Sequence, residues 1–370
     1  MDAGRNNRSK GGGFKAALGG GIVALGLCAG GAVAPGQGYA PVFVGFYDAW
    51  DRSDRPALPK QLEKLDVFAP RWITVRGAKG DVVVEPDHGE AALAAQQGAR
   101  LTVMPLVSNA HDDIWDAAAA DAVILDPTVQ KAFAARLVQL AQARGFAGYV
   151  FDFENLSPRT EAAYGAMLKA VRQGLSPSGR QVWATMGPGP DEPLPAVAAA
   201  ADAAVLMAYD ECWATSNAGP IAGADWLARL LSDRLAGLEP RRVVVAMAAY
   251  GYDWPAGAAG RPIGAAEAMR LAARLRAKVA RDPASQNVHF AYTAADGRLH
   301  QVWFIDAGAF AADRAVAARW SPRGYAIWRL GLEDPALWTL ARAPRAPAGH
   351  PPAPSRGPAP HPCNPLKPPS

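Results

Sequence analysis

Eight short apolar segments recur along the middle of the chain, and segments typical of amphipathic helices separate them. They are PVFVGFY (41–47), WITV (72–75), LTVMPLV (101–107), GYVFDF (148–153), QVWATM (181–186), AAVLMAY (203–209), VVVAMAAY (243–250) and GYAIW (324–328). Segments that are apolar on both faces are typical of parallel strands covered by helices, and helices are predicted, for example, at 126–144 and 223–238. This alternation predicts an α/β fold, a (β/α)8 TIM barrel. A doubly wound open sheet is the alternative that periodicity leaves open.

The chain between the seventh and eighth segments is longer than one helix requires. Residues 288–306 show two alternating strands around a turn at Asp296-Gly297, which predicts an antiparallel hairpin. A helical segment, 263–280, precedes it. We therefore expect a small α+β insertion at about 262–306, between the seventh and eighth strands, that walls one side of a cleft.

Polar and aromatic residues follow the predicted strands at their carboxyl ends, where barrel enzymes place their active sites. The fourth segment carries Asp152 and Glu154, which as positions i and i+2 of a strand would lie side by side. Burying two unpaired carboxylates is costly, so they are either paired structurally, for example with arginines, or chemically active. The residues at the other strand ends are Asp48, Trp50, Ser108, Asn109, Tyr209, Asp210, Tyr250, Trp328 and Arg329.

The composition argues against several other classes of function. Half of the 370 residues are hydrophobic and 19% are charged, which is typical of a globular protein, and the net charge of +4 is only mildly basic. No Lys/Arg-rich run with interleaved aromatic residues is present, so we expect no nucleic-acid partner. The sequence has no Walker A, GxGxxG, HExxH or CxxC pattern, so we expect neither a cofactor nor a metal. The cysteines are three and far apart, and Cys212 is expected to be a half-buried thiol in a loop.

The two ends of the chain are not expected to belong to the barrel, which we place at 40–342. Residues 1–15 are basic and residues 16–34 are apolar and uncharged, which indicates an export signal peptide within 1–35. Pro35 would hinder cleavage after Ala34, so an uncleaved membrane anchor is the alternative. In both cases the domain is exported, and is periplasmic, secreted or anchored to the cytoplasmic membrane. Residues 343–370 are rich in proline and are predicted to form a disordered tail.

Four motifs, in this order and spacing, resemble glycoside hydrolase family 18, the chitinase-type family. FAGYVFDFE aligns with the DxxDxDxE motif of the family's fourth strand, so that Asp152 and Glu154 are its last two acids. MAYD (207–210), AYGYDW (249–254) and GYAIW (324–328) match the sixth, seventh and eighth strands. The resemblance covers roughly residues 40–340 and is closest to bacterial members acting on peptidoglycan or poly-N-acetylglucosamine.

Two positions depart from the family's fourth-strand motif, because Ala147 and Val150 replace its first two acids. In the family, the second of these acids supports the aspartate beside the catalytic glutamate. With Val150 in its place, we expect the pKa of Asp152 to be raised less by like-charge repulsion. The resemblance therefore implies a slow enzyme.

The resemblance also implies a substrate-assisted retaining mechanism, in which the substrate's own 2-acetamido group replaces an enzymic nucleophile. Glu154 is then the general acid/base, Asp152 orients the acetamide N–H, and Tyr209 donates its hydroxyl to the acetamide carbonyl. Asp210 binds sugar hydroxyls, and Trp328 forms the floor on which the pyranose ring stacks. Further cleft contacts are expected from Asn109, Tyr250 and Trp50.

The expected substrate is a polysaccharide or oligosaccharide that contains β-linked N-acetylglucosamine, and we expect a monomer. Membrane contact is expected only through the N-terminal segment. Two other classes of function remain open. A chitinase-like carbohydrate-binding protein would share the scaffold without turnover, although such loss usually shows first at the glutamate, and Glu154 is intact. A cell-wall-associated structural protein is indicated only if neither sugar binding nor cleavage is found.

Overall fold

The computed structural model describes residues 40–48, 56–111, 114–340 and 363–366. Three predictions concern residues outside these ranges: the signal peptide or anchor at 1–35, Trp50, and the tail apart from residues 363–366. The predictions made for them stay predictions. Among the helices of the described ranges, none is both long enough and apolar enough to cross a membrane.

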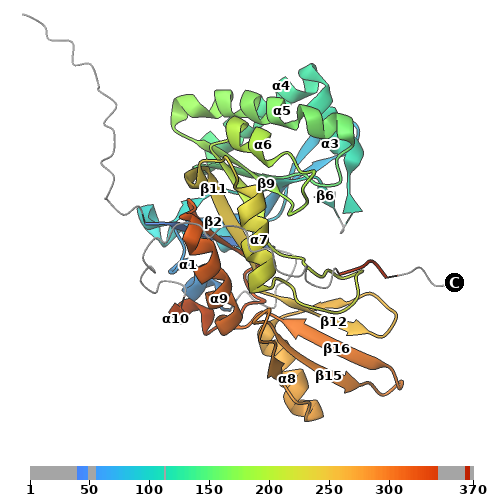
Figure 1. The fold of residues 1–370 in the computed structure, drawn as a ribbon. Helices are drawn as coiled ribbons and strands as arrows, with labels where there is room; N and C mark the ends of the chain where they lie inside the picture. Colours follow the sequence, from blue (N-terminus) through green and yellow to red (C-terminus); the bar gives the residue numbers. More distant parts are fainter. Residues whose placement is uncertain (1–39, 49–55, 112–113, 341–362, 367–370) are drawn as a thin grey trace, which may run out of the picture. The chain divides into compact units, whose positions relative to one another are not determined.

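Eight parallel strands with helices around them form the body of the protein (Figure 1). The strands are β1 (Val42–Tyr47), β2 (Val67–Arg76), β5 (Leu106–Ser108), β8 (Gly148–Asp152), β9 (Gln181–Met186), β10 (Ala203–Met207), β11 (Val243–Ala248) and β17 (Gly324–Trp328). Strand β1 pairs with both β2 and β17, so the sheet closes on itself. The predicted (β/α)8 barrel is confirmed, and the open doubly wound sheet is excluded. Two short strands extend this sheet: β3 (Asp81–Val84) pairs antiparallel with β2, and β4 (Thr102–Val103) pairs parallel with it.

The helices around the barrel are α1 (Leu58–Leu62), α2 (Glu90–Ala95), α3 (Ala117–Leu125), α4 (Pro127–Arg144), α5 (Pro158–Leu175), α6 (Leu194–Ala200), α7 (Ala224–Arg234), α9 (Ala307–Ala317) and α10 (Leu337–Leu340). Of these, α3, α4, α5 and α9 begin after a residue whose side chain caps the first turn. In α4, the Asp126 carboxylate accepts hydrogen bonds from the amides of Thr128 and Val129, and Pro127 occupies the first turn. Gly145, with a φ of 71°, ends the helix in the left-handed conformation. The helices predicted at 126–144 and 223–238 correspond to α4 and α7.

Alternation along β8 decides which of its side chains face the barrel interior. The Tyr149 hydroxyl donates a hydrogen bond to the Leu137 carbonyl of α4 at 2.7 Å, and the Phe151 ring contacts Phe133 of the same helix. Both residues therefore point outward to the helix layer. Val150 and Asp152 alternate with them and face inward. This arrangement places a carboxyl group at the inner, carboxyl end of the strand.

The insertion between β11 and β17 is a second, antiparallel sheet covered by one helix. It consists of β12 (Gly251–Pro255), β13 (Arg261–Ile263), α8 (Ala265–Leu275), β14 (Ala280–Arg281), β15 (Val288–Thr293) and β16 (Leu299–Phe304). The predicted hairpin is confirmed, because β15 pairs with β16 up to Thr293 and Leu299, around Asp296-Gly297. The insertion starts at Gly251 rather than near residue 262, because β12 leaves the barrel and pairs with β16, Tyr252 opposite Trp303.

The structure contradicts the predictions for Cys212 and for part of the tail. Cys212 is fully buried and forms a disulfide with Cys363, 151 residues later, with a Cα–Cα distance of 5.2 Å. Residues 363–366 are ordered against the loop that follows β10: the Leu366 amide donates to the Thr215 carbonyl at 2.8 Å, and the Asn217 amide to the Asn364 carbonyl at 2.9 Å. The prediction of a half-buried thiol at Cys212 was therefore wrong. Spacing along the chain could not reveal the pair, because its two cysteines are 151 residues apart.

Candidate active site

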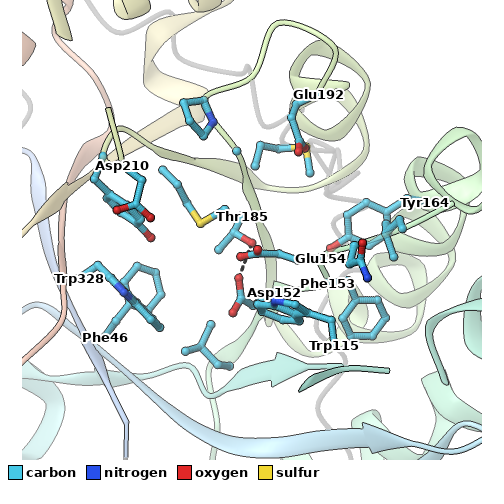
Figure 2. A pocket seen from close by; sticks show the side chains of 18 of the residues that line it. Phe46, Trp115, Asp152, Phe153, Glu154, Tyr164, Thr185, Glu192, Asp210 and Trp328 are labelled. Atoms are coloured by element: carbon cyan, nitrogen blue, oxygen red, sulfur yellow. Dashed lines mark hydrogen bonds between the residues drawn. The ribbon is translucent and has the colours of Figure 1, made fainter. Parts of the chain in front are cut away.

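A cavity of about 600 Å³ opens at the carboxyl ends of the barrel strands (Figure 2). It reaches the last residues of β8, β9, β10 and β17. Residues predicted from the sequence that line it are Asp152, Glu154, Tyr209, Asp210 and Trp328. The fold therefore brings together side chains from three separate motifs.

Asp152 is the last residue of β8 and is only 4% exposed. The Thr185 hydroxyl, from the neighbouring strand β9, donates a hydrogen bond to Asp152 Oδ1 at 2.8 Å. Burial is the largest cause that raises the pKa of Asp152, while the Arg71 guanidinium opposes this rise and the Asp48 carboxylate adds to it. Burial, rather than repulsion by a motif acid, therefore sets the direction of its pKa shift.

An ion pair inside the barrel provides the charged neighbours of Asp152. Arg71 of β2 and Asp48 are both buried, and the Arg71 Nη2 to Asp48 Oδ2 distance is 3.4 Å. In the sheet register Arg71 lies beside Leu106, which lies beside Val150, so their side chains share the inward face. An arginine–aspartate pair is thus present on the inward face, where the motif acid is replaced by Val150.

The main chain of Glu154 is held by Asn109. Asn109 Oδ1 accepts a hydrogen bond from the Glu154 amide at 3.0 Å, and its Nδ2 donates to the Glu154 carbonyl at 3.1 Å. Asn109 is fully buried and does not line the cavity. The prediction that Asn109 contacts sugar is therefore wrong. Position at a strand end identified the right edge of the sheet, but Asn109 acts as a positioning residue for Glu154.

The Glu154 side chain is the strongest candidate for a proton donor. Burial raises its pKa to about 8, and the carboxylates of Asp152, Glu192 and Asp210 contribute in the same direction, against the Arg71 guanidinium. Its carboxyl group forms no hydrogen bond with another side chain of the described ranges. A group with this pKa is mainly protonated at neutral pH and can transfer its proton into the cavity.

Tyr209 and Asp210 follow β10 on the opposite wall. Asp210 has a φ of 60°, a left-handed conformation that aspartate tolerates better than most residues. Burial raises the pKa of Asp210 to about 6. The hydrogen bonds that Tyr250 and Tyr252 donate to this carboxylate act in the opposite direction and lower the pKa. Burial also raises the pKa of Tyr209 well above its ordinary value, so its hydroxyl remains a donor.

Tyr250 was expected to contact the substrate, and the structure places it behind Asp210 instead. Its ring is 5% exposed and does not line the cavity. Its hydroxyl donates to Asp210 Oδ1, and its ring meets that of Tyr209 edge to face at 6.1 Å. Tyr250 therefore positions Asp210 and Tyr209 rather than the sugar.

Trp328 ends β17 and presents its half-buried ring to the cavity beside Phe46, with centroids 5.7 Å apart. In Figure 2, Trp328 and Asp210 lie to one side of Asp152 and Glu154, and Tyr164 lies to the other side. Trp115 belongs to β7 (Ile114–Trp115), which pairs with β6 (Ala110–His111).

Several lining residues were missed by sequence reasoning. Thr185 carried a signal, since it lies near the carboxyl end of the predicted fifth strand. Arg71 was hidden because the second strand was predicted to start at Trp72, whereas β2 begins at Val67. Tyr164 occupies an ordinary helical position, and Glu192 and Trp115 lie outside any motif. In the ranges described, no three His, Cys, Asp or Glu side chains are grouped so as to hold a metal ion.

Comparison with known proteins agrees with this geometry. Residues 42–333 match the family described as Glycosyl hydrolases family 18. The cortical fragment-lytic enzyme of Bacillus subtilis is 27% identical over 305 residues, covering 76% of this chain and 70% of that protein. A chitinase of Chromobacterium violaceum has a TM-score of 0.74 and 25% identity, covering 82% of this chain and 98% of that one. The Bacillus cereus spore cortex-lytic enzyme SleL shares the fold, with a TM-score of 0.74 and 22% identity over 81% of this chain and 73% of that one. Because the family match spans most of the chain, this protein belongs to glycosyl hydrolase family 18 and is a glycoside hydrolase.

Proposed function

We propose that the protein hydrolyses polysaccharide containing β-linked N-acetylglucosamine, by a substrate-assisted mechanism that retains the anomeric configuration. The observation that carries this proposal is the Glu154 carboxyl group, which faces the cavity next to Asp152 with a pKa raised to about 8. A carboxylic acid that keeps its proton at neutral pH is what protonation of a glycosidic oxygen requires.

In the first step, the acetamide oxygen of the bound sugar attacks its own anomeric carbon, and the bond to the leaving oxygen breaks. Glu154 gives its proton to that oxygen, and the sugar becomes a bicyclic oxazolinium ion. In the second step, Glu154, now ionised, takes a proton from water as the water attacks the anomeric carbon. The ring opens, and the second substitution restores the original configuration.

Asp152 and Tyr209 supply the surroundings of the acetamide group. Because Thr185 binds one oxygen of Asp152, the other oxygen is left to accept the acetamide N–H. Tyr209 donates its hydroxyl to the acetamide carbonyl from the opposite wall. Asp210, oriented by two tyrosine hydroxyls, accepts sugar hydroxyls, and the Trp328 ring provides an apolar floor for the pyranose.

The relatives and the disulfide support the biological setting of this proposal. Two similar proteins are named a cortical fragment-lytic enzyme and a chitinase. The Cys212–Cys363 disulfide is typical of proteins outside the reducing cytoplasm. We propose that the protein acts as a monomer after export by residues 1–35, and that it is periplasmic, secreted or anchored to the cytoplasmic membrane.

The mechanism is tested with defined β-linked N-acetylglucosamine oligomers. Cleavage is followed by a reducing-end assay, and the configuration of the first-formed product by NMR. We expect retention, no cleavage of the fully de-N-acetylated oligomer, and inhibition by a thiazoline mimic of the intermediate. Inverted product, or efficient cleavage of the deacetylated oligomer, would overturn substrate assistance. Binding of the N-acetylated oligomers without any cleavage would favour a carbohydrate-binding protein instead.

A further inference from the structure

We propose that the cleft has a second subsite, formed by Glu161, Glu192, Tyr164 and Trp115, that selects an amino sugar with a free ammonium group next to the reacting N-acetylated unit. This inference rests on the proposed function and names a substrate class for it: partially de-N-acetylated glucosamine polymer. All four residues line the cavity, and Figure 2 shows Tyr164 beyond Glu154, on the side away from Trp328 and Asp210.

Carboxyl groups greatly outnumber basic groups in the lining of the cavity. Its lining contains the carboxyl groups of Asp152, Glu154, Glu161, Glu192 and Asp210. Among the described residues that line it, Arg71 is the only arginine or lysine, and it is already paired with Asp48. The proposed chemistry uses the three acids at 152, 154 and 210 and leaves Glu161 and Glu192 without a role.

Glu161 and Glu192 come from different elements, and both line the cavity. Glu161 lies in the first turn of α5, and Glu192 lies in the loop between β9 and α6. Burial and the Glu161 carboxylate both raise the pKa of Glu192, so the Glu161 carboxylate repels negative charge on Glu192. A cation placed between them relieves that repulsion.

Arg234 is the cation that acts on Glu192, and its hydrogen bonds go to carbonyl groups. Arg234 of α7 donates its guanidinium N–H groups to the Pro190 carbonyl at 3.1 Å and to the Glu192 carbonyl at 2.9 Å. Its charge lowers the pKa of Glu192, but these bonds go to the main chain and not to the carboxylate. The carboxylate has a hydrogen bond from the Gly187 amide, which leaves it further acceptor capacity for a ligand.

Tyr164 gives an independent sign that a ligand belongs here. Its side chain is completely buried, its ring stacks on Phe153 at 6.0 Å and 16°, and it lines the cavity. Yet its hydroxyl has no hydrogen-bond partner in the described part of the chain. Buried hydroxyl groups are nearly always paired, and the carboxyl groups of Asp152, Glu192 and Glu154 all act to raise the pKa of this one, so it keeps its proton. It can accept a hydrogen bond from an ammonium group held between the carboxylates.

Trp115 supplies the apolar surface that a sugar ring needs. Its half-buried indole lines the cavity. An indole face binds a pyranose by contact and attracts a cation through its ring electrons. The combination selects a ring with a positive substituent, and it disfavours a ring with a carboxylate such as the lactyl group of muramic acid.

The test compares kcat/KM for soluble oligosaccharides of equal length in low salt. One is fully N-acetylated, others carry one glucosamine on either side of the reacting unit, and others carry N-acetylmuramic acid there. We expect one glucosamine isomer to be preferred over the fully acetylated oligomer by about fivefold, and the carboxylate-bearing isomer to be worst. The preference should shrink at high salt because screening weakens it.

The ratio of kcat/KM for the glucosamine substrate to kcat/KM for the fully acetylated substrate should fall to about one in the double variant Glu161→Gln, Glu192→Gln. Tyr164→Phe should lower this ratio by less. Glu63→Gln, on the surface at the end of α1, is the matched control and should leave the ratio unchanged. A ratio of one in the wild type, or a ratio that survives the double variant, would overturn the subsite. If no oligomer is cleaved, the proposed function fails, and calorimetric binding of the same oligomers then gives the ratio that decides the subsite.

Discussion

The two walls of the cleft hold their carboxyl groups in opposite ways. On the wall made by β10, β11 and β12, the Asp210 carboxylate accepts hydrogen bonds from the hydroxyls of Tyr250 and Tyr252. On the wall made by β8 and β9, the Glu154 carboxyl receives no hydrogen bond from a side chain of the described ranges, although its main chain is held on both sides by Asn109. Asp210 is therefore held by its side chain, whereas Glu154 is held by its backbone.

This difference gives Asp210 and Glu154 different protonation states. Burial raises the pKa of both groups, but donated hydroxyls hold that of Asp210 to about 6, whereas carboxylate neighbours help to bring that of Glu154 to about 8. At pH 7 the first is mainly ionised and the second mainly protonated. In the mechanism we propose, Asp210 is then the acceptor for sugar hydroxyls and Glu154, across from it, the donor for the glycosidic oxygen.

The largest expected effect comes from removing the transferable proton. Glu154→Gln keeps size and polarity, and we expect kcat to fall by about 10²–10⁴-fold while oligosaccharide binding and thermal stability stay close to wild type. Turnover is measured with the purified variant, and folding by circular dichroism. Wild-type-like turnover would remove Glu154 from the mechanism.

The next effect is the pH dependence of the wild type. Only the protonated form of Glu154 can donate, so kcat/KM, which reports the free enzyme, should fall about tenfold per pH unit once the pH rises through about 8. Below that pH this group imposes no loss, and any acid limb belongs to Asp152 or Asp210. Profiles are measured at constant ionic strength. An alkaline limb that persists in the residual activity of Glu154→Gln would show that another group controls it.

A smaller effect on activity is expected from a substitution on the wall that carries Asp210. Tyr250→Phe removes a hydrogen bond that favours the ionised form of Asp210, so the pKa of Asp210 should rise above about 6. KM should then increase roughly three- to tenfold near pH 6, and less at pH 8, with a smaller change in kcat. Tyr149→Phe, whose hydroxyl bonds a helix carbonyl away from the cleft, is the control. Equal losses in kcat at all pH values would instead indicate general disruption of the wall.

The smallest effect is expected from restoring a motif acid. Val150→Asp places a carboxylate on the inward face one step below Asp152 and in the same sheet layer as Arg71. Because this arginine partly compensates the new charge, we expect a change in kcat of less than about threefold and a displaced pH optimum. The variant Val150→Asn, which adds polarity without charge, is the matched control. A loss of folding in both variants would show that the layer accepts only apolar side chains.

The barrel was predictable because its strands are buried on both faces, and such segments are recognisable without knowledge of their partners. For the site, the sequence could predict which residues lie at the carboxyl ends of the strands, but not which of their side chains face the cavity. Asn109 and Tyr250 were placed at the correct ends, but alternation and packing, which depend on neighbouring strands, turn them away from the cavity. Arg71 and Tyr164 reach the site from an inner layer and from a helix, so no motif marks them. The Cys212–Cys363 bond depends on a tertiary contact between distant segments.

That disulfide also changes what proteolysis does to the molecule. It closes a covalent ring that contains α7, β11, the whole insertion and β17, and the exposed turn at Asp296-Gly297 lies within the ring. A protease that cuts this turn produces two fragments that stay joined until a reductant is added. The nicked protein would keep Asp210 and Trp328 on one molecule, and its fragments would separate on a gel only under reducing conditions.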